Sequence, residues 1–73
     1  MARIDIKSEI TGTVWKVTTG PGDKVDSGDA LLIIESMKME IPVITEDAGT
    51  VVEILVQEKE AVAEGQVVAV LDG

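Results

Sequence analysis

The chain alternates short runs of aliphatic residues with closely spaced turn residues. Val and Ile, which fit a pleated strand better than a helix, account for eleven and eight of the 73 residues. The runs predict strands at residues 3–7, 12–18, 30–35, 39–44, 49–56 and 67–71, with two short extended pieces near Val25 and Val62. Turn residues cluster at 20–23, 26–29, 47–49 and 64–66. The pattern therefore predicts an all-β fold.

The chain is also an internal duplication, because residues 1–36 align with residues 38–73 without a gap. The identical pairs are Ile4/Ile41, Glu9/Glu46, Gly12/Gly49, Thr13/Thr50, Val14/Val51, Val25/Val62 and Gly28/Gly65. Residues 52–63 alone could be drawn as an amphipathic helix, but they align with a segment that contains Gly20-Pro21-Gly22, which a helix does not tolerate. We therefore predict strand, turn and strand in both halves, within a single domain over residues 1–73.

The duplication predicts how the strands are arranged. One half is expected to pack on the other, giving two sheets about 10 Å apart. The spacing of three in Val14–Val17 and in Val51–Ile54 breaks strict alternation and predicts a bulge or bend after Gly12 and Gly49. Pro42 cannot donate to a ladder, so its strand is expected at a sheet edge or a bulge.

Composition excludes several classes of chemistry. The chain has no Cys and no His, so zinc sites, thiol chemistry and Ser-His-Asp hydrolysis lack their usual residues. A chain of 73 residues is also too small to enclose a deep cleft. We therefore expect a module rather than an enzyme, with no catalytic residue and no metal site.

Charge and hydropathy restrict the partners. Six Lys or Arg against fourteen Asp or Glu give a formal charge of −8, which disfavours nucleic acid as a partner. No apolar run approaches the ~18 residues of a membrane span, and the first residues lack the apolar stretch of a signal peptide. We expect a cytoplasmic domain that does not bind a membrane.

The junction of the two halves is the most unusual segment, Glu35-Ser36-Met37-Lys38-Met39-Glu40, which lies between two apolar strands. It predicts a β-hairpin with a two-residue turn at Met37 and Lys38, although such turns prefer Asn or Gly because φ must be positive. Lys38 at the tip would present its amine away from the body of the domain, with Met37 and Met39 exposed on either side. The residues alone favour a plainer interpretation, in which Lys38 is a solvated turn lysine and Met37 and Met39 pack beneath the turn.

This hexapeptide resembles the biotin-attachment signature of biotin carboxyl carrier domains, in which the Lys of a Met-Lys-Met tripeptide is biotinylated. The resemblance extends from about Ile4 to Leu71 and includes the matched glycines of the two halves. It implies a flattened barrel or sandwich of two four-stranded antiparallel sheets, related by a quasi-two-fold axis. The hairpin is then expected at one end of the domain and both termini at the other.

The resemblance also implies a function. Biotin would be attached to Lys38 by a biotin protein ligase, with Met37 and Met39 positioning the cofactor and Glu35 and Glu40 serving ligase recognition. A biotin carboxylase would carboxylate the biotin, and a carboxyltransferase would pass the carboxyl group to an acyl-CoA, as in acetyl-CoA carboxylase and fatty acid biosynthesis. The domain would be the non-catalytic carrier of a multi-subunit carboxylase.

Two alternatives stay open. A lipoyl carrier shares the fold and the hairpin Lys, but it more often flanks that Lys with Asp and Ala than with two Met. An unmodified β interaction domain would use the same fold without any attached cofactor.

The chain departs from the family pattern at two places. Residues 8–11, Ser-Glu-Ile-Thr, lie where many members have a Pro-Met pair. Lys59 and Glu60 stand where a Gly-Asp pair is usual, which predicts a strained positive φ at Lys59 costing about 1 kcal/mol or more. The lone Trp15 is expected to be a packing residue or a surface cover.

Overall fold

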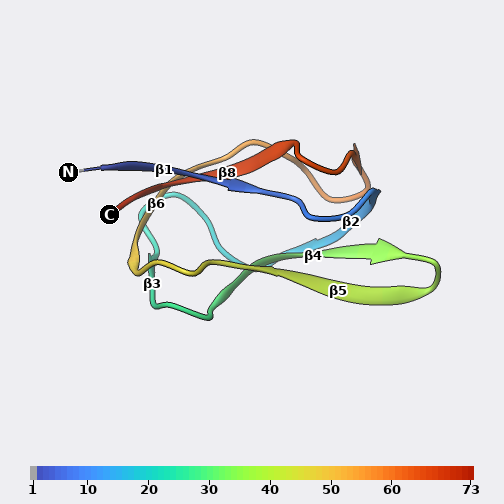
Figure 1. Cartoon of the computed structure of the whole chain (residues 1–73), viewed down its shortest axis with the longest axis horizontal. Helices are drawn as coiled ribbons and strands as arrows, with labels where there is room; N and C mark the ends of the chain where they lie inside the picture. Colours follow the sequence, from blue (N-terminus) through green and yellow to red (C-terminus); the bar gives the residue numbers. More distant parts are fainter. Residues whose placement is uncertain (1) are drawn as a thin grey trace.

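The computed structural model describes residues 2–73, and its eight strands form two four-stranded antiparallel sheets (Figure 1). The strands are β1 (Arg3–Lys7), β2 (Gly12–Val17), β3 (Lys24–Val25), β4 (Ala30–Ser36), β5 (Met39–Ile44), β6 (Gly49–Ile54), β7 (Ala61–Val62) and β8 (Val67–Asp72). All the predicted strands and both short pieces are confirmed, with ends that differ by two residues at most. Residues 52–63 contain no helix, as the duplication predicted.

The two halves are interleaved, so the expectation that one half packs on the other is wrong. The strand order is β1-β8-β6-β3 in one sheet and β5-β4-β2-β7 in the other. Replacing each strand by its counterpart in the other half converts one order into the other, so each sheet takes two strands from each half. The connections explain this, because those of four to six residues cross between the sheets. Only the two-residue turn at 37–38 joins strands that are neighbours in one ladder.

The core between the sheets repeats the duplication. Buried counterparts from the two halves are Val14/Val51, Val25/Val62, Leu31/Val68 and Ile34/Leu71. The two buried polar residues, Ser8 and Thr45, are counterparts as well. Each hydroxyl donates to the carbonyl oxygen two residues further on, at 2.6 Å and 2.7 Å, and accepts a hydrogen bond from the N–H of that same residue. These paired contacts end β1 and β5 and turn the chain out of its sheet.

Two irregularities expected from the sequence are confirmed. The register of β2 on β4 shifts between Val14 and Lys16, and the register of β6 on β8 shifts at the counterpart position. Trp15 therefore lies at a bulge, and its side chain is 46% exposed, which makes it a surface cover. Pro42 lies on β5, which is an edge strand.

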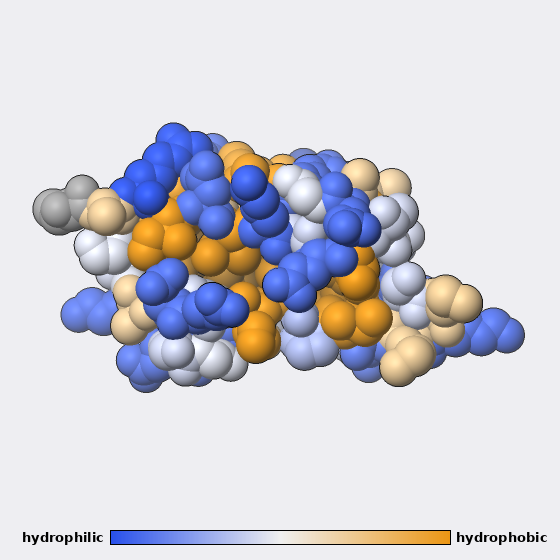
Figure 2. Space-filling view, viewed as in Figure 1, coloured by the Kyte–Doolittle hydropathy of each residue, from blue (hydrophilic) through white to orange (hydrophobic). Residues whose placement is uncertain are grey.

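The molecule measures 36 × 17 × 17 Å, with the β4–β5 hairpin at one end and both chain ends at the other (Figure 1). This is the arrangement that the resemblance implied. The sheets do not close into a barrel, because β1 and β5 are edge strands. Apolar surface is visible between these two strands in Figure 2. Residues 2–73 contain no helix that is long and apolar enough to cross a membrane.

Candidate functional site

The candidate site is the tip of the β4–β5 hairpin. The ladder ends with the pair Ser36 and Met39, and the next two residues close the turn. Met37 and Lys38 have φ values of 52° and 66°, so both adopt the left-handed conformation that a type I′ hairpin turn requires. The predicted turn is therefore confirmed. Non-glycine residues in this region cost of order 1 kcal/mol or more each. The pairing of β4 with β5 therefore stabilises a turn that Met37 and Lys38 themselves disfavour.

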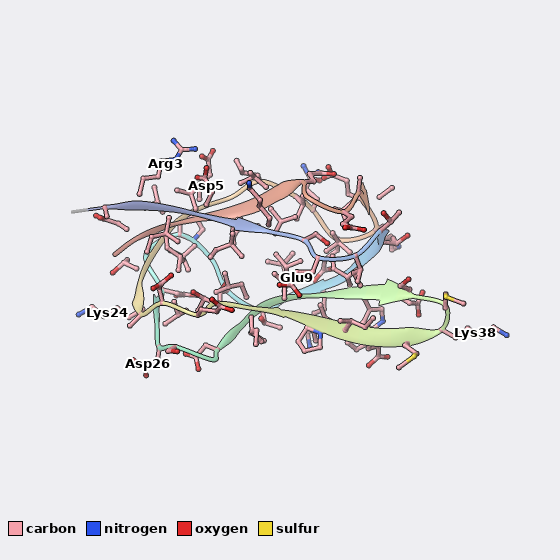
Figure 3. The ribbon with its side chains drawn as sticks, viewed as in Figure 1. Arg3, Asp5, Glu9, Lys24, Asp26 and Lys38 are labelled. Carbon is pink, nitrogen blue, oxygen red and sulfur yellow. The ribbon has the colours of Figure 1, made fainter. Side chains whose placement is uncertain are left out.

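The side chains of the tip are exposed rather than packed. Met37 is 92% exposed and Met39 is 63% exposed, so the interpretation that both pack beneath the turn is wrong. Figure 3 shows the amino group of Lys38 pointing away from the domain, at the end of the molecule opposite to the chain ends. The tip thus presents a primary amine to solvent between two flexible apolar side chains, which gain no burial energy there.

Glu35 and Glu40 lie directly opposite each other, one pair below the tip. Both are exposed, and within residues 2–73 neither takes part in a salt bridge. Like charges at directly opposite positions of an antiparallel pair destabilise it. Two carboxylates therefore face solvent beside Lys38 at some cost to the ladder, and they are free to contact another molecule.

Gly12 supports the hairpin from the neighbouring strand β2, a contact that the sequence analysis did not assign. A Cβ atom at this position would overlap the carbonyl oxygen of Glu35 and lie 2.8 Å from Cγ2 of Ile34. Only glycine lets β2 approach β4 this closely. The signal in the sequence was the identity of Gly12 with its counterpart Gly49, whose own Cβ would lie 2.7 Å from the carbonyl oxygen of Asp72.

The chemistry open to this tip is acylation. In the part of the chain that the structure describes, no three Asp or Glu side chains are grouped so that they could hold a metal ion. The feature that the tip offers is the amine of Lys38, which can form an amide with an activated carboxyl group. A cofactor that carries such a carboxyl group fits the site, because nothing in the body of the domain covers the amine.

Comparison with known proteins agrees with this geometry. The family model described as "Biotin-requiring enzyme", which represents the biotin/lipoyl attachment domain, matches residues 4–71. A curated relative, the biotinylated protein TB7.3 homolog of Mycobacterium leprae, is 39% identical over 67 residues, which cover 92% of this chain and 94% of the relative.

Two solved structures are similar to this chain in fold and in sequence. The urea carboxylase of Kluyveromyces lactis superposes with a TM-score of 0.93 and 38% identity over 99% of this chain, which corresponds to 6% of that protein. The lipoyl domain of the 2-oxoglutarate dehydrogenase complex from Azotobacter vinelandii superposes with a TM-score of 0.78 and 29% identity, over 96% of each chain. The chain belongs to the biotin/lipoyl attachment family, as the resemblance in its sequence indicated.

Proposed function

We propose that this chain is a biotin carboxyl carrier, in which the ε-amine of Lys38 forms an amide with the carboxyl group of biotin. The observation that carries the proposal is the placement of an exposed lysine, flanked by two exposed methionines, on a strained turn at the far end of the domain. The name of the Mycobacterium leprae relative, a biotinylated protein, supports biotin as the cofactor. When bound, biotin supplies a ureido nitrogen that accepts a carboxyl group and later releases it.

The domain contributes reach and local concentration to this chemistry. Lys38 stands at the end of a body that is 36 Å long and 17 Å wide, so the amine can enter a partner's active site while the rest of the domain stays outside. Tethering makes each transfer nearly intramolecular, provided that the arm spans both active sites. The carrier itself supplies no catalytic residue to either reaction.

We assign the flanking residues to two roles. The unpaired carboxylates of Glu35 and Glu40 serve recognition by a biotin protein ligase, since they lie beside Lys38 and gain nothing from each other. Met37 and Met39 position the attached cofactor, because they offer it apolar surface on both sides of the attachment point.

The proposed partners are the ligase, a biotin carboxylase and a carboxyltransferase in a multi-subunit enzyme of the cytoplasm. The resemblance implies an acyl-CoA as the carboxyl acceptor, with acetyl-CoA carboxylase and fatty acid biosynthesis as the specific case. Urea is a second candidate acceptor, favoured by the TM-score of 0.93 to urea carboxylase. Carboxylation assays of the assembled holoenzyme with either acceptor distinguish the two.

A lipoyl carrier is the alternative within the family. The lipoyl domain has the lower TM-score and identity of the two solved structures described above, and two Met flank the lysine in this chain. Both comparisons favour biotin.

Modification of the full chain by an active biotin ligase tests the proposal. We expect one biotinyl amide by intact mass, detected with streptavidin and abolished in Lys38→Arg, which keeps the charge. Lys59→Arg is the matched control, because Lys59 is also an exposed turn lysine with a positive φ, of 76°. An unlabelled wild-type chain, or a labelled Lys38→Arg variant, contradicts the assignment, and a lipoyl increment on protein from its native cells selects the alternative.

The positioning role of the methionines has its own test. Met37→Gln and Met39→Gln remove the apolar surface at nearly constant size, and they should leave the free energy of unfolding within about 0.5 kcal/mol of the wild type, since both side chains are exposed. Ligase labelling should also persist, while carboxyl transfer by the assembled holoenzyme slows. Unchanged transfer rates in both variants would remove the positioning role and leave Lys38 as the attachment point.

A further inference from the structure

A groove of about 780 Å³ runs along the side of the domain where the two sheets do not join. Its walls are the edge strands β1 and β5 with the segments that follow them. Its aliphatic side chains are those of Ile4, Ile6, Ile10, Ile41, Val43 and Ile44, and Pro42 lies among them. Figure 2 shows this apolar surface between the two strands, with hydrophilic residues on either side. A groove with an apolar lining is one kind of surface that an amphipathic helix can bind.

The border of the groove is acidic. Asp5, Glu9, Glu46, Asp47 and Glu64 line it together with the cation Lys7. The carboxylate of Asp5 is paired with Arg3 at 3.0 Å, whereas none of the other four acids takes part in a salt bridge within residues 2–73. Figure 3 places Glu9 midway along this side, between β1 and the β4–β5 ladder. The groove therefore combines an aliphatic floor with an excess of negative charge.

These features disfavour three kinds of occupant. A second copy would bring an equally acidic border, and an anionic lipid surface would also be repelled. Addition of a strand is disfavoured on β5, where Pro42 has no N–H to donate. It is disfavoured on β1 as well, where the charged residues Arg3, Asp5 and Lys7 alternate along the edge. A helix needs no backbone pairing from either wall.

We propose that this groove docks a cationic amphipathic helix of a partner protein, with the aliphatic side chains of the helix on the groove floor and its Lys or Arg side chains against Glu9, Glu46, Asp47 and Glu64. The five residues of β1 extend over about 17 Å, a length that about eleven helical residues span. Charge complementarity at the border fixes the orientation of such a helix and speeds its association.

The groove and the hairpin tip can be used together. Ile41, the groove residue of β5 nearest to the tip, is three residues from Lys38, which corresponds to about 10 Å along the strand. A helix in the groove therefore leaves Lys38 exposed. The docking site does not depend on the modification of Lys38, so each proposal can fail without the other.

The test uses the full chain labelled with ¹⁵N and a synthetic peptide of about 14 residues, with Leu at helix positions i, i+3, i+4 and i+7 and Lys at most others. We expect saturable chemical-shift changes at residues 4–10, 41–47 and 64–65, and none at residues 37–39. A peptide of the same composition in scrambled order, and one with Glu in place of Lys, should bind at least about tenfold more weakly.

Variants of the chain separate this site from general attraction to an acidic protein. Glu9→Gln combined with Glu46→Gln, and Ile44→Ser alone, should each weaken binding at least about fivefold while the spectrum stays folded, because all three side chains are exposed. Asp26→Asn combined with Glu53→Gln changes the charge equally outside the groove and should leave binding unchanged. Unsaturable shifts, shifts spread over acidic residues elsewhere, equal binding of the scrambled peptide, or equal loss in the control variant would each overturn the proposal.

Discussion

The two ends of the molecule are built on one plan and differ in their residues. At the hairpin end the last pair is Ser36 with Met39, and at the other end its counterpart is Gly73 with Ala2, which exchange hydrogen bonds of 3.3 Å and 2.9 Å. The next pair is Glu35 with Glu40 at the hairpin, and Asp72 with Arg3 at the chain ends. Like charges thus face each other at one end and opposite charges at the other.

This difference indicates that folding stability accounts for the residues at the terminal end but not for those at the hairpin end. The hairpin end has two non-glycine residues at positive φ, exposed methionines and a repulsive pair, whereas the terminal end has none of these among its described residues. The strained turn and the like-charge pair each cost folding energy, and the exposed methionines gain none from burial. All of these features lie at or beside Lys38. The duplicated scaffold therefore supports at one end a local sequence that folding alone would not favour.

The largest expected effect comes from the two glycines that allow the close strand approach at each end. Gly12→Ala should lower the free energy of unfolding by about 2 kcal/mol, because the new Cβ meets the backbone at Glu35 and cannot be accommodated by a side-chain rotation. Gly49→Ala should cost a similar amount at Asp72. Urea unfolding measures both losses.

Ligase labelling of the folded fraction of each variant then compares the hairpin end with the terminal end. Gly12→Ala should reduce it, since β4 shifts at the base of the hairpin, and Gly49→Ala should leave it unchanged. Equal labelling of both variants would show that the tip does not depend on the β2 support.

Most of the fold could be predicted from the internal duplication together with local sequence rules. Strand positions, both bulges, the edge position of Pro42 and the conformation at Met37 and Lys38 followed from alternation, spacing and turn rules, which act over a few neighbouring residues. Which strands share a sheet did not follow, because an alignment of two halves fits packed halves and interleaved halves equally well.

Contacts between distant segments could not be predicted from the sequence either. The groove depends on which edge strands face each other across the open side, and that is set by the sheet order. The sequence left the exposure of Met37 open, since a methionine next to a turn can pack or project with the same sequence pattern.

A smaller effect is expected where one half has a glycine and the other a lysine at the same turn. Gly22 has a φ of 93° and its counterpart Lys59 has a φ of 76°, so the strain predicted from the sequence is located at Lys59. Lys59→Gly should raise the free energy of unfolding by about 1 kcal/mol, and Gly22→Lys should lower it by about as much. Thermal unfolding measures both, and labelling at Lys38 should not change. A destabilised Lys59→Gly variant would contradict the prediction that the backbone at Lys59 is strained.

Relief of the strain in the hairpin turn is expected to raise the stability of the domain and to impair its function. Asn tolerates the left-handed conformation better than Met, so Met37→Asn should stabilise the domain by about 0.5 to 1 kcal/mol, seen as a rise of a few degrees in Tm. Carboxyl transfer by the holoenzyme should slow, because one of the two apolar neighbours of Lys38 is lost. A variant that gains stability and keeps full transfer would break the link between strain and function at this end.

The smallest effect concerns the charge pair that distinguishes the two ends. Glu40→Arg gives the hairpin the opposite-charge pair of the terminal end and should raise the free energy of unfolding by about 0.5 kcal/mol, a gain that shrinks in about 1 M NaCl. Arg3→Glu is the reciprocal change, and it should destabilise the terminal end by at least as much because Arg3 also pairs with Asp5. Labelling by the ligase should fall in Glu40→Arg and persist in Arg3→Glu, measured on the folded protein with streptavidin. If Glu40→Arg is labelled as fast as the wild type, the repulsive pair has no role in recognition, and the unfavourable charge at the hairpin needs another cause.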